Sequence, residues 1–243
     1  MKISKIIDYF KEYGPILFFK KLANMVVSKI MLPCFMINAK LFKSSDINEL
    51  IDFVYGSPIE PMQIPEEIFE LLEIIKEKKP KTVLEIGTAR GGNLFLFSRI
   101  ITGDSKIISI DLPGGLFGGG YSKLRMLMYK FFAKDNQSLR LVRKDSHQEG
   151  TLEDLKNILG NEKIDFLFID GDHSYNGVKK DFEMYSPLVS KDGIIGFHDI
   201  VEGLEENVGG VPAFWQEIKN NYKYKEIVES WNQGGYGIGL IFK

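Results

Sequence analysis

The stretch EIGTARGGN, Glu85 to Asn93, joins an apolar strand to a helix through three glycines. Gly87, Gly91 and Gly92 allow a sharp backbone turn and let a ligand lie directly against the chain. The first amide groups of the following helix are free to donate hydrogen bonds at the same place. Asp111 ends the next predicted strand 24 residues after Gly87, and a carboxylate there can hold both hydroxyls of a ribose. The stretch therefore predicts a nucleoside-like ligand at the end of a buried strand.

Strand and helix patterns alternate on both sides of this turn, which is typical of a doubly wound parallel sheet. Two further strand patterns, YKEIVES and GYGIGLIFK, surround the hairpin signal WNQGG, so one of them is expected to run antiparallel. We predict an α/β fold with a seven-stranded, mostly parallel, doubly wound sheet of Rossmann-like type. The five earlier strands are expected at residues 82–87, 106–111, 139–145, 163–170 and 193–199.

Residues 1–65 lack this alternation and are expected to form a helical N-terminal extension to the domain at 66–243. The boundary falls in GSPIEPMQIP, residues 56–65, because three prolines there interrupt a helix. Lys29 and Pro33 break the apolar segment 22–41, so we expect an amphipathic helix that packs on the domain or on a partner subunit, with a membrane-surface role as the alternative. We predict no integral membrane segment, and a homo-oligomer can form through these helices.

Composition excludes several classes of function. Lysine and arginine number 31 against 33 acids, and this lack of a basic excess argues against a nucleic-acid partner. A single cysteine, Cys34, allows neither an internal disulfide nor a cysteine zinc cluster. With no convincing secretory signal, we expect a cytoplasmic protein.

Polar side chains gather where the fourth and fifth predicted strands end. Asp170, Asp172 and His173 follow FLFI, and His198 and Asp199 follow GIIGF. Neighbouring parallel strands lie about 4.8 Å apart, so these groups can converge. Two carboxylates with an imidazole can hold a divalent cation, and a histidine can take the proton of a substrate hydroxyl.

Structural roles are open for some of the same residues. Asp172 is expected to cap the helix that begins near Tyr175, and His198 is as well explained by a hydrogen-bonded histidine beside the sheet. Thr151 with Asp154 suggests a capping box at the start of the helix 151–159.

The motif EIGTARGG followed by SID resembles the first two motifs of the class I S-adenosylmethionine-dependent methyltransferases, over about residues 66–243. The resemblance implies a Rossmann-like methyltransferase domain in which Gly87 and Gly91 line the methionine part of the cofactor. It also implies that Asp111 binds the ribose and that Asp145 and Ser146 border the adenine. The full expected cofactor-binding set is Glu85, Gly87, Thr88, Gly91, Asp111, Asp145, Ser146 and Asp170.

DGDHSYNGV followed by GFHDI resembles the branch that contains bacterial sugar and macrolide O-methyltransferases and cephalosporin-tailoring proteins. The resemblance implies that His173 is the general base, that Asp170 and Asp199 are metal ligands and that the ion is Mg²⁺ or another divalent cation. His198 is the third expected ligand, at a place where metal-dependent relatives usually carry an acid. Two alternatives follow: the ion is weakly held, or it is absent and His198 is a second base or a substrate contact.

We therefore predict an S-adenosylmethionine-dependent O-methyltransferase that acts on a hydroxyl of a small acceptor, a sugar or natural-product glycoside. One alternative is an NAD-dependent oxidoreductase, but Ala89 occupies the second glycine position of its G-x-G-x-x-G fingerprint. The other is a non-catalytic binding protein that retains the fold. The glycine-rich stretch 112–120 is expected to be a lid or an exposed loop. Aromatic side chains that can contact the acceptor are Tyr121, Trp215, Trp231 and Tyr236.

Overall fold

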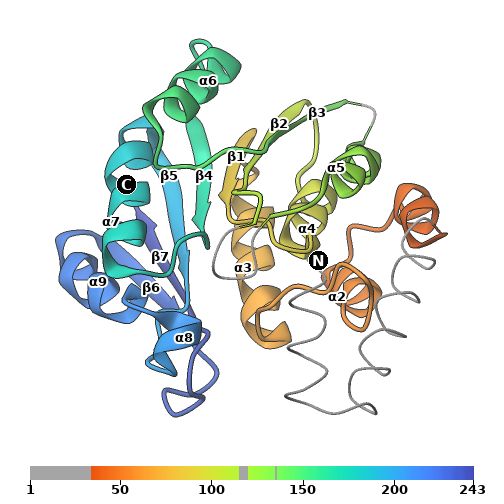
Figure 1. Cartoon of the computed structure of the whole chain (residues 1–243). Helices are drawn as coiled ribbons and strands as arrows, with labels where there is room; N and C mark the ends of the chain where they lie inside the picture. Colours follow the sequence, from red (N-terminus) through yellow and green to blue (C-terminus); the bar gives the residue numbers. More distant parts are fainter. Residues whose placement is uncertain (1–33, 115–119, 135) are drawn as a thin grey trace, which may run out of the picture.

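A seven-stranded sheet forms the centre of the computed structural model, which describes residues 34–114, 120–134 and 136–243 (Figure 1). The strand order is β3-β2-β1-β4-β5-β7-β6. Strands β1 to β5 are parallel, and β7 is antiparallel to both β5 and β6. This arrangement confirms the predicted fold class. The strands are β1 (Thr82–Ile86), β2 (Ser105–Ile110), β3 (Gln137–Val142), β4 (Ile164–Ile169), β5 (Val189–His198), β6 (Lys223–Ile227) and β7 (Ile238–Phe242).

Helices cover both faces of the sheet (Figure 1). On one side lie α2 (Ile47–Val54), α3 (Pro65–Lys78), α4 (Gly92–Ile100) and α5 (Lys123–Tyr129). On the other lie α6 (Glu149–Leu159), α7 (Tyr175–Tyr185) and α9 (Val211–Ile218), while the short α8 (Glu205–Val208) precedes α9. Three short 3-10 turns are also present, Lys130–Phe132, Ser186–Leu188 and Lys219–Asn221, and residues 34–41 are helical.

Alternate residues of the central strands enter two separate cores. Val83 of β1 and Phe166 of β4 pack on the side of α3 and α4. Leu84 and Leu167, each the next residue along its strand, pack on the side of α6 and α7. Because successive strand side chains point to opposite faces, burial on both faces requires the continuous apolar runs seen in the sequence. Because β1, β2, β3 and β4 pair in parallel, their carboxyl ends lie side by side.

A buried cation joins the helical residues 34–41 to α4 and to the turn that ends at Phe132. Arg99 of α4 is 2% exposed and donates hydrogen bonds to the carbonyl oxygens of Ala39 and Phe132, both at 2.6 Å. Ala39 belongs to the helical residues 34–41 that precede α2. Its carbonyl and that of Phe132 lie at the C-terminal ends of their helical turns, where positive charge is favourable. The division at residue 65 remains a prediction, and α2 packs on α3 and α4.

Two predicted helix caps are wrong, although α7 begins at Tyr175 as predicted. Helix α6 begins at Glu149, and the hydroxyl of Thr151 donates to the carbonyl oxygen of Asp145 at 2.6 Å, so it forms no capping box. Helix α7 is capped by Ser174, whose hydroxyl accepts the amide of Gly177 at 3.0 Å. Asp172 instead accepts the amide of Ser174 at 2.9 Å and shapes the turn before the helix. In both cases the side chain that was expected to cap the helix, Thr151 or Asp172, forms a hydrogen bond with the backbone of the preceding loop or turn instead.

The predictions made for residues 1–33 and for most of the glycine-rich stretch 112–120 fall outside the described residues. Among the described residues, none of the helices has the length and hydrophobicity needed to cross a bilayer.

Candidate active site

The turn after β1 brings two strand ends and one helix together. Gly87 has φ +86°, and a Cβ there would lie 1.9 Å from the carbonyl oxygen of Asp170, so any other residue would collide with β4. Gly91 has φ +93°, and a Cβ there would lie 2.6 Å from the ring of Tyr129. Both positions therefore require glycine, for a left-handed backbone and for close packing.

Asp111, at the end of β2, is fixed by this turn. Its Oδ2 accepts the amides of Thr88 at 3.1 Å and Ala89 at 3.0 Å. Burial raises the pKa of Asp111 to about 6, although the hydrogen bonds from Thr88 and Ala89 act in the opposite direction. The carboxylate is therefore rigid and partly desolvated, a state that suits a ligand with hydroxyl groups.

A cavity of about 210 Å³ opens at the carboxyl ends of β1 to β4. It contains five of the eight residues expected to bind the cofactor: Gly87, Asp111, Asp145, Ser146 and Asp170. The strand ends thus bring together groups that are up to 83 residues apart in the sequence, from Gly87 to Asp170.

The other three expected residues, Glu85, Thr88 and Gly91, are not part of the cavity wall. Glu85 is 1% exposed, and its Oε2 accepts the hydroxyl of Thr88 at 2.7 Å. The Thr88 hydroxyl also lies 2.6 Å from the hydroxyl of Ser109. Burial raises the pKa of Glu85 well above its usual value. These residues support the turn from beneath rather than facing the cavity.

His147, which the sequence analysis did not single out, also lines the cavity. Its Nε2 lies 3.3 Å from Oδ1 of Asp181, a carboxylate with no exposed surface. The interaction of the imidazole with the Asp181 carboxylate is the main cause that raises the pKa of His147. Its backbone amide donates to Oδ1 of Asp145 at 2.9 Å. Its position directly after Asp145 and Ser146 was the available signal.

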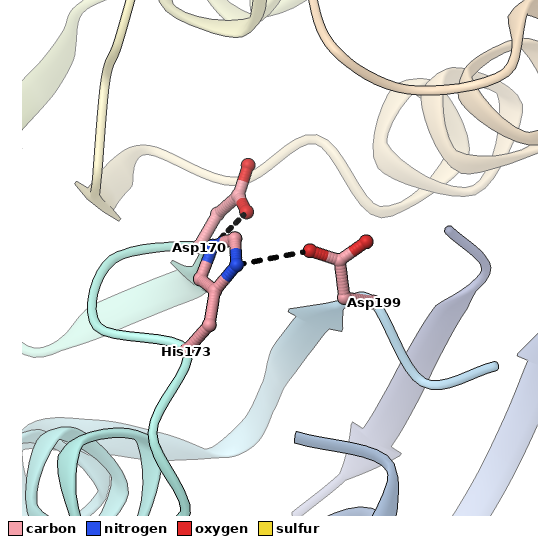
Figure 2. Close-up of side chains that lie close together, drawn as sticks. All are labelled: Asp170, His173 and Asp199. Atoms are coloured by element: carbon pink, nitrogen blue, oxygen red, sulfur yellow. Dashed lines mark ion pairs between the residues drawn. The ribbon is translucent and has the colours of Figure 1, made fainter. Parts of the chain in front are cut away.

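Four side chains converge where β4 and β5 end. Figure 2 shows the imidazole of His173 between the carboxylates of Asp170 and Asp199. Its Nε2 lies 3.5 Å from Asp170 Oδ1, and its Nδ1 lies 3.3 Å from Asp199 Oδ2. His198 Nδ1 lies 3.1 Å from the same oxygen of Asp170 and 3.4 Å from the same oxygen of Asp199. The predicted convergence of two acids and two histidines is therefore present.

The charges of this cluster shift one another's pKa values. Burial acts to lower the pKa of His173, but the hydrogen bond to Asp170 and the charges of Asp170 and Asp199 prevail and raise it to about 9. The pKa of His198 is also well above its usual value, because the same two acids outweigh its burial. Burial alone would raise the pKa of Asp170, yet the positive charge of His198 and the hydrogen bond from His173 hold it below its usual range.

The cluster also has the donors that a divalent cation needs. Single ligand atoms of Asp170, His173 and Asp199 lie within 4.8 Å of one another. This grouping contains His173, whereas the sequence analysis expected His198 as the third ligand. His198 Nε2 is buried and has no hydrogen-bond partner among the described residues. Carboxylate oxygens with an imidazole suit Mg²⁺ or Mn²⁺, so the residues present fit such an ion.

Comparison with known proteins covers the region that contains this site. Residues 84–200 match the model of a family described as a methyltransferase domain. Two curated relatives are both described as uncharacterised proteins. One, from Sinorhizobium fredii, is 26% identical over 181 residues, and the match covers 70% of this chain and 18% of the relative. The other, from Acanthamoeba polyphaga mimivirus, is 33% identical over 133 residues, and the match covers 54% of this chain and 57% of the relative.

Solved structures extend the likeness to most of the chain. An O-methyltransferase from Bacillus cereus in complex with S-adenosylhomocysteine has a TM-score of 0.53 at 17% identity, with 83% of this chain and 92% of that chain covered. The O-methyltransferase TomG from Streptomyces achromogenes, in complex with S-adenosylmethionine, has a TM-score of 0.52 at 14% identity, with 81% and 88% covered. At such identities the likeness establishes the fold, and the predicted resemblance is confirmed. Residues 84–200 of this chain therefore match a methyltransferase domain, and the chain has the fold seen in these O-methyltransferases.

Proposed function

We propose that this chain transfers the methyl group of S-adenosylmethionine to a hydroxyl of a small acceptor. The observation that carries the proposal is the position of Asp170, which belongs both to the cavity wall and to the cluster of two acids and two histidines. One end of a ligand in the cavity would thus lie beside groups that can accept or donate a proton. That adjacency is what methyl transfer to a hydroxyl requires.

The cavity offers a place for each part of the cofactor. Asp111 is a carboxylate at the end of β2, suited to the ribose hydroxyls, and Asp145 and Ser146 at the end of β3 can border the adenine. Gly87 lets the methionine part lie close to the backbone. When bound, S-adenosylmethionine supplies a methyl group activated by a positively charged sulfur.

His173 is the group that we assign to take the acceptor's proton. Its two ring nitrogens lie near Asp170 Oδ1 and Asp199 Oδ2, which hold the ring between β4 and β5 (Figure 2). Asp199 stabilises the imidazolium that forms when the proton is taken. With a pKa of about 9 the ring is mostly protonated at neutral pH, so it acts as a base only after losing that proton. A divalent cation bound near His173 would favour the loss of that proton.

Asp170 and Asp199, with His198 completing the set, would hold the cation and leave His173 to act as the base. A cation at these carboxylates supplies Lewis acidity that lowers the pKa of a nearby hydroxyl. It also neutralises the two negative charges that keep His173 protonated. The distances of His198 Nδ1 from Asp170 Oδ1 and Asp199 Oδ2, 3.1 and 3.4 Å, support this assignment.

For the acceptor we propose a sugar or a natural-product glycoside. Tyr236 is 41% exposed, and its ring centroid lies 6.2 Å from that of His198. Trp231, in the same loop between β6 and β7, is 54% exposed. Aromatic faces of this kind can stack on a sugar ring. Tyr121 and Trp215, also considered from the sequence, are fully buried and belong to the core.

The remaining predictions stand beside this proposal. The net charge of −2 supports a small-molecule acceptor rather than nucleic acid. A homo-oligomer formed through the N-terminal helices and a cytoplasmic location also stay predictions.

The deciding experiment has two stages. In the first, S-adenosylhomocysteine and NAD are compared as stabilisers of the protein against heat. Stabilisation by S-adenosylhomocysteine is expected, and stabilisation by NAD alone would favour the oxidoreductase. In the second, a panel of sugars and glycosides is tested for uptake of labelled methyl from S-adenosylmethionine, with His173→Ala as the control. Cofactor binding without transfer to any acceptor class would favour a non-catalytic protein.

A further inference from the structure

Gln63 connects the loop before α3 to the acid cluster. The residue is 5% exposed, and its Nε2 donates to Asp170 Oδ2 at 2.7 Å. On its other side, Asn93 Nδ2 donates to Gln63 Oε1 at 3.0 Å. Its backbone carbonyl accepts the hydroxyl of Tyr55 at 2.8 Å. Gln63 is thus held from three directions, by the loop, by α4 and by β4.

The chemistry of the partners fixes which way the Gln63 amide faces. An ionised carboxylate accepts hydrogen bonds and cannot donate them, so the NH₂ group must face Asp170. The carbonyl oxygen is then directed at Asn93, which lies in the first turn of α4 and donates to it. Rotating the Gln63 amide by half a turn would break both hydrogen bonds and leave buried polar groups unsatisfied.

This arrangement divides the two oxygens of Asp170 between different partners. Oδ2 is taken by Gln63, while Oδ1 faces His173 at 3.5 Å and His198 at 3.1 Å. A carboxylate is free to rotate unless something holds one oxygen, and here the held oxygen is the one that faces away from the imidazoles. The rotation of Asp170 is therefore set by a residue that lies 107 positions earlier in the chain.

We propose that Gln63, with Asn93 behind it, is a positioning residue that sets the Asp170 carboxylate for His173, His198 and a divalent cation. The inference rests on the proposed function, because the cluster must be an active site for its geometry to affect a reaction. It assigns a role in that site to the loop before α3, which the sequence analysis interpreted only as a boundary. Gln63 itself need touch neither cofactor nor acceptor.

A purely structural role makes a different prediction. If Gln63 only fastened the loop, its replacement would lower stability and leave the acid cluster unchanged. Gln137 provides a matched control, since its side-chain amide donates to the carbonyl oxygens of Ser98 and Ile101 at 3.0 and 3.1 Å, outside the cluster. Gln137→Leu removes the same kind of group from another site. Gln63→Glu keeps the shape and the acceptor for Asn93, but it replaces the donor to Asp170 with a carboxylate oxygen and adds a negative charge beside it.

The experiment measures two properties of wild type, Gln63→Leu, Gln63→Glu and Gln137→Leu. The first is the dissociation constant for Mn²⁺, followed by electron paramagnetic resonance. The second is the set of imidazole nitrogen resonances of the metal-free protein at one fixed pH. The chain has three histidines, so each resonance can be assigned by substitution. His147, in a separate cluster with Asp181, is the internal reference.

Gln63→Leu is expected to weaken Mn²⁺ binding by tenfold or more, the usual effect of losing a partner of a metal ligand. Both Gln63 variants are expected to move the resonances of His173 and His198 while leaving that of His147 in place, and Gln137→Leu should change neither property. Unchanged resonances of His173 and His198 in folded Gln63→Glu and Gln63→Leu would overturn the proposal. Failure of the wild type to bind Mn²⁺ would instead defeat the cation in the proposed function, while the resonances would still decide the role of Gln63.

Discussion

His173 Nδ1 lies 3.3 Å from Asp199 Oδ2, so an imidazole that follows β4 faces a carboxylate that follows β5 (Figure 2). The pairing joins adjacent parallel strands, and it depends on the close spacing of strands in a sheet. It also holds the His173 ring at the edge of the cavity, because Asp170 contacts the other ring nitrogen. The ring is thus oriented before any ligand binds.

Replacing His173 with alanine should lower the rate of methyl transfer by about 10²–10⁴-fold, the usual contribution of a general base. The dissociation constant for S-adenosylhomocysteine should stay within about twofold, because His173 is not part of the cavity wall. Calorimetric titration and single-turnover transfer assays measure the two quantities. His147→Ala is the control with the opposite expectation, since His147 lines the cavity. A His173→Ala enzyme that retains its rate would remove the base from the mechanism.

The pH dependence of transfer should change when the divalent cation is removed. His173 accepts a proton only when neutral, and its pKa in the metal-free cluster is about 9. After chelation the rate should therefore fall as the pH drops below about 9. If Mg²⁺ binds at Asp170 and Asp199 as proposed, it neutralises their charge and should lower this midpoint by at least one pH unit. Initial rates between pH 6 and 10 measure the shift.

Identical pH profiles with and without chelator would show that no cation acts on His173.

The protonated His173 has a separate consequence for folding. Its pKa is raised from 6.5 to about 9, so its ion pairs stabilise the metal-free fold fully below pH 6.5. That contribution is lost as the pH rises through 9.

The buried Asp111 carboxylate is expected to lower the stability of the protein at neutral pH, while it contributes to cofactor binding. Its pKa is raised from 3.8 to about 6, so the folded protein binds more protons than the unfolded chain between these values, and stability falls as the pH rises through this range. Asp111→Asn keeps an oxygen for the amides of Thr88 and Ala89. At pH 7 it should raise the free energy of unfolding by about 1–3 kcal/mol, and near pH 4 it should have little effect.

The same Asp111→Asn change should weaken S-adenosylhomocysteine binding by tenfold or more, because a charged acceptor for the ribose hydroxyls is lost. Urea unfolding at both pH values and calorimetric titration measure the two effects. Wild-type affinity in the variant would mean that Asp111 is only a support of the turn at Thr88 and Ala89.

The sequence was sufficient for the sheet and for the strand ends. Continuous apolar runs specify buried strands, and in a parallel sheet the strand ends must meet, so the convergence of Asp170 and Asp199 followed from local patterns. The contact of Gln63 with Asp170 did not, because the 107 residues between them carry no pattern that encodes it. Thr151 failed as a predicted cap for a related reason. A hydroxyl can satisfy either a helix end or a loop carbonyl, and the tertiary structure decides which.

The contacts of Arg99 could not be predicted from the sequence either, and they lead to a prediction about stability. Its guanidinium is buried in α4, stacks 4.8 Å from the centre of the Phe95 ring and donates to the carbonyl oxygens of Ala39 and Phe132. Burial lowers its pKa to about 10, so it stays charged at pH 7. Arg99→Ala should reduce the free energy of unfolding by about 2–4 kcal/mol, because two buried carbonyls lose their donors and the packing on Phe95 is lost. Arg140→Ala, at an exposed position, should change it by less than about 0.5 kcal/mol. Equal midpoints of urea unfolding for the two variants would show that Arg99 does not hold residues 34–41 against the domain.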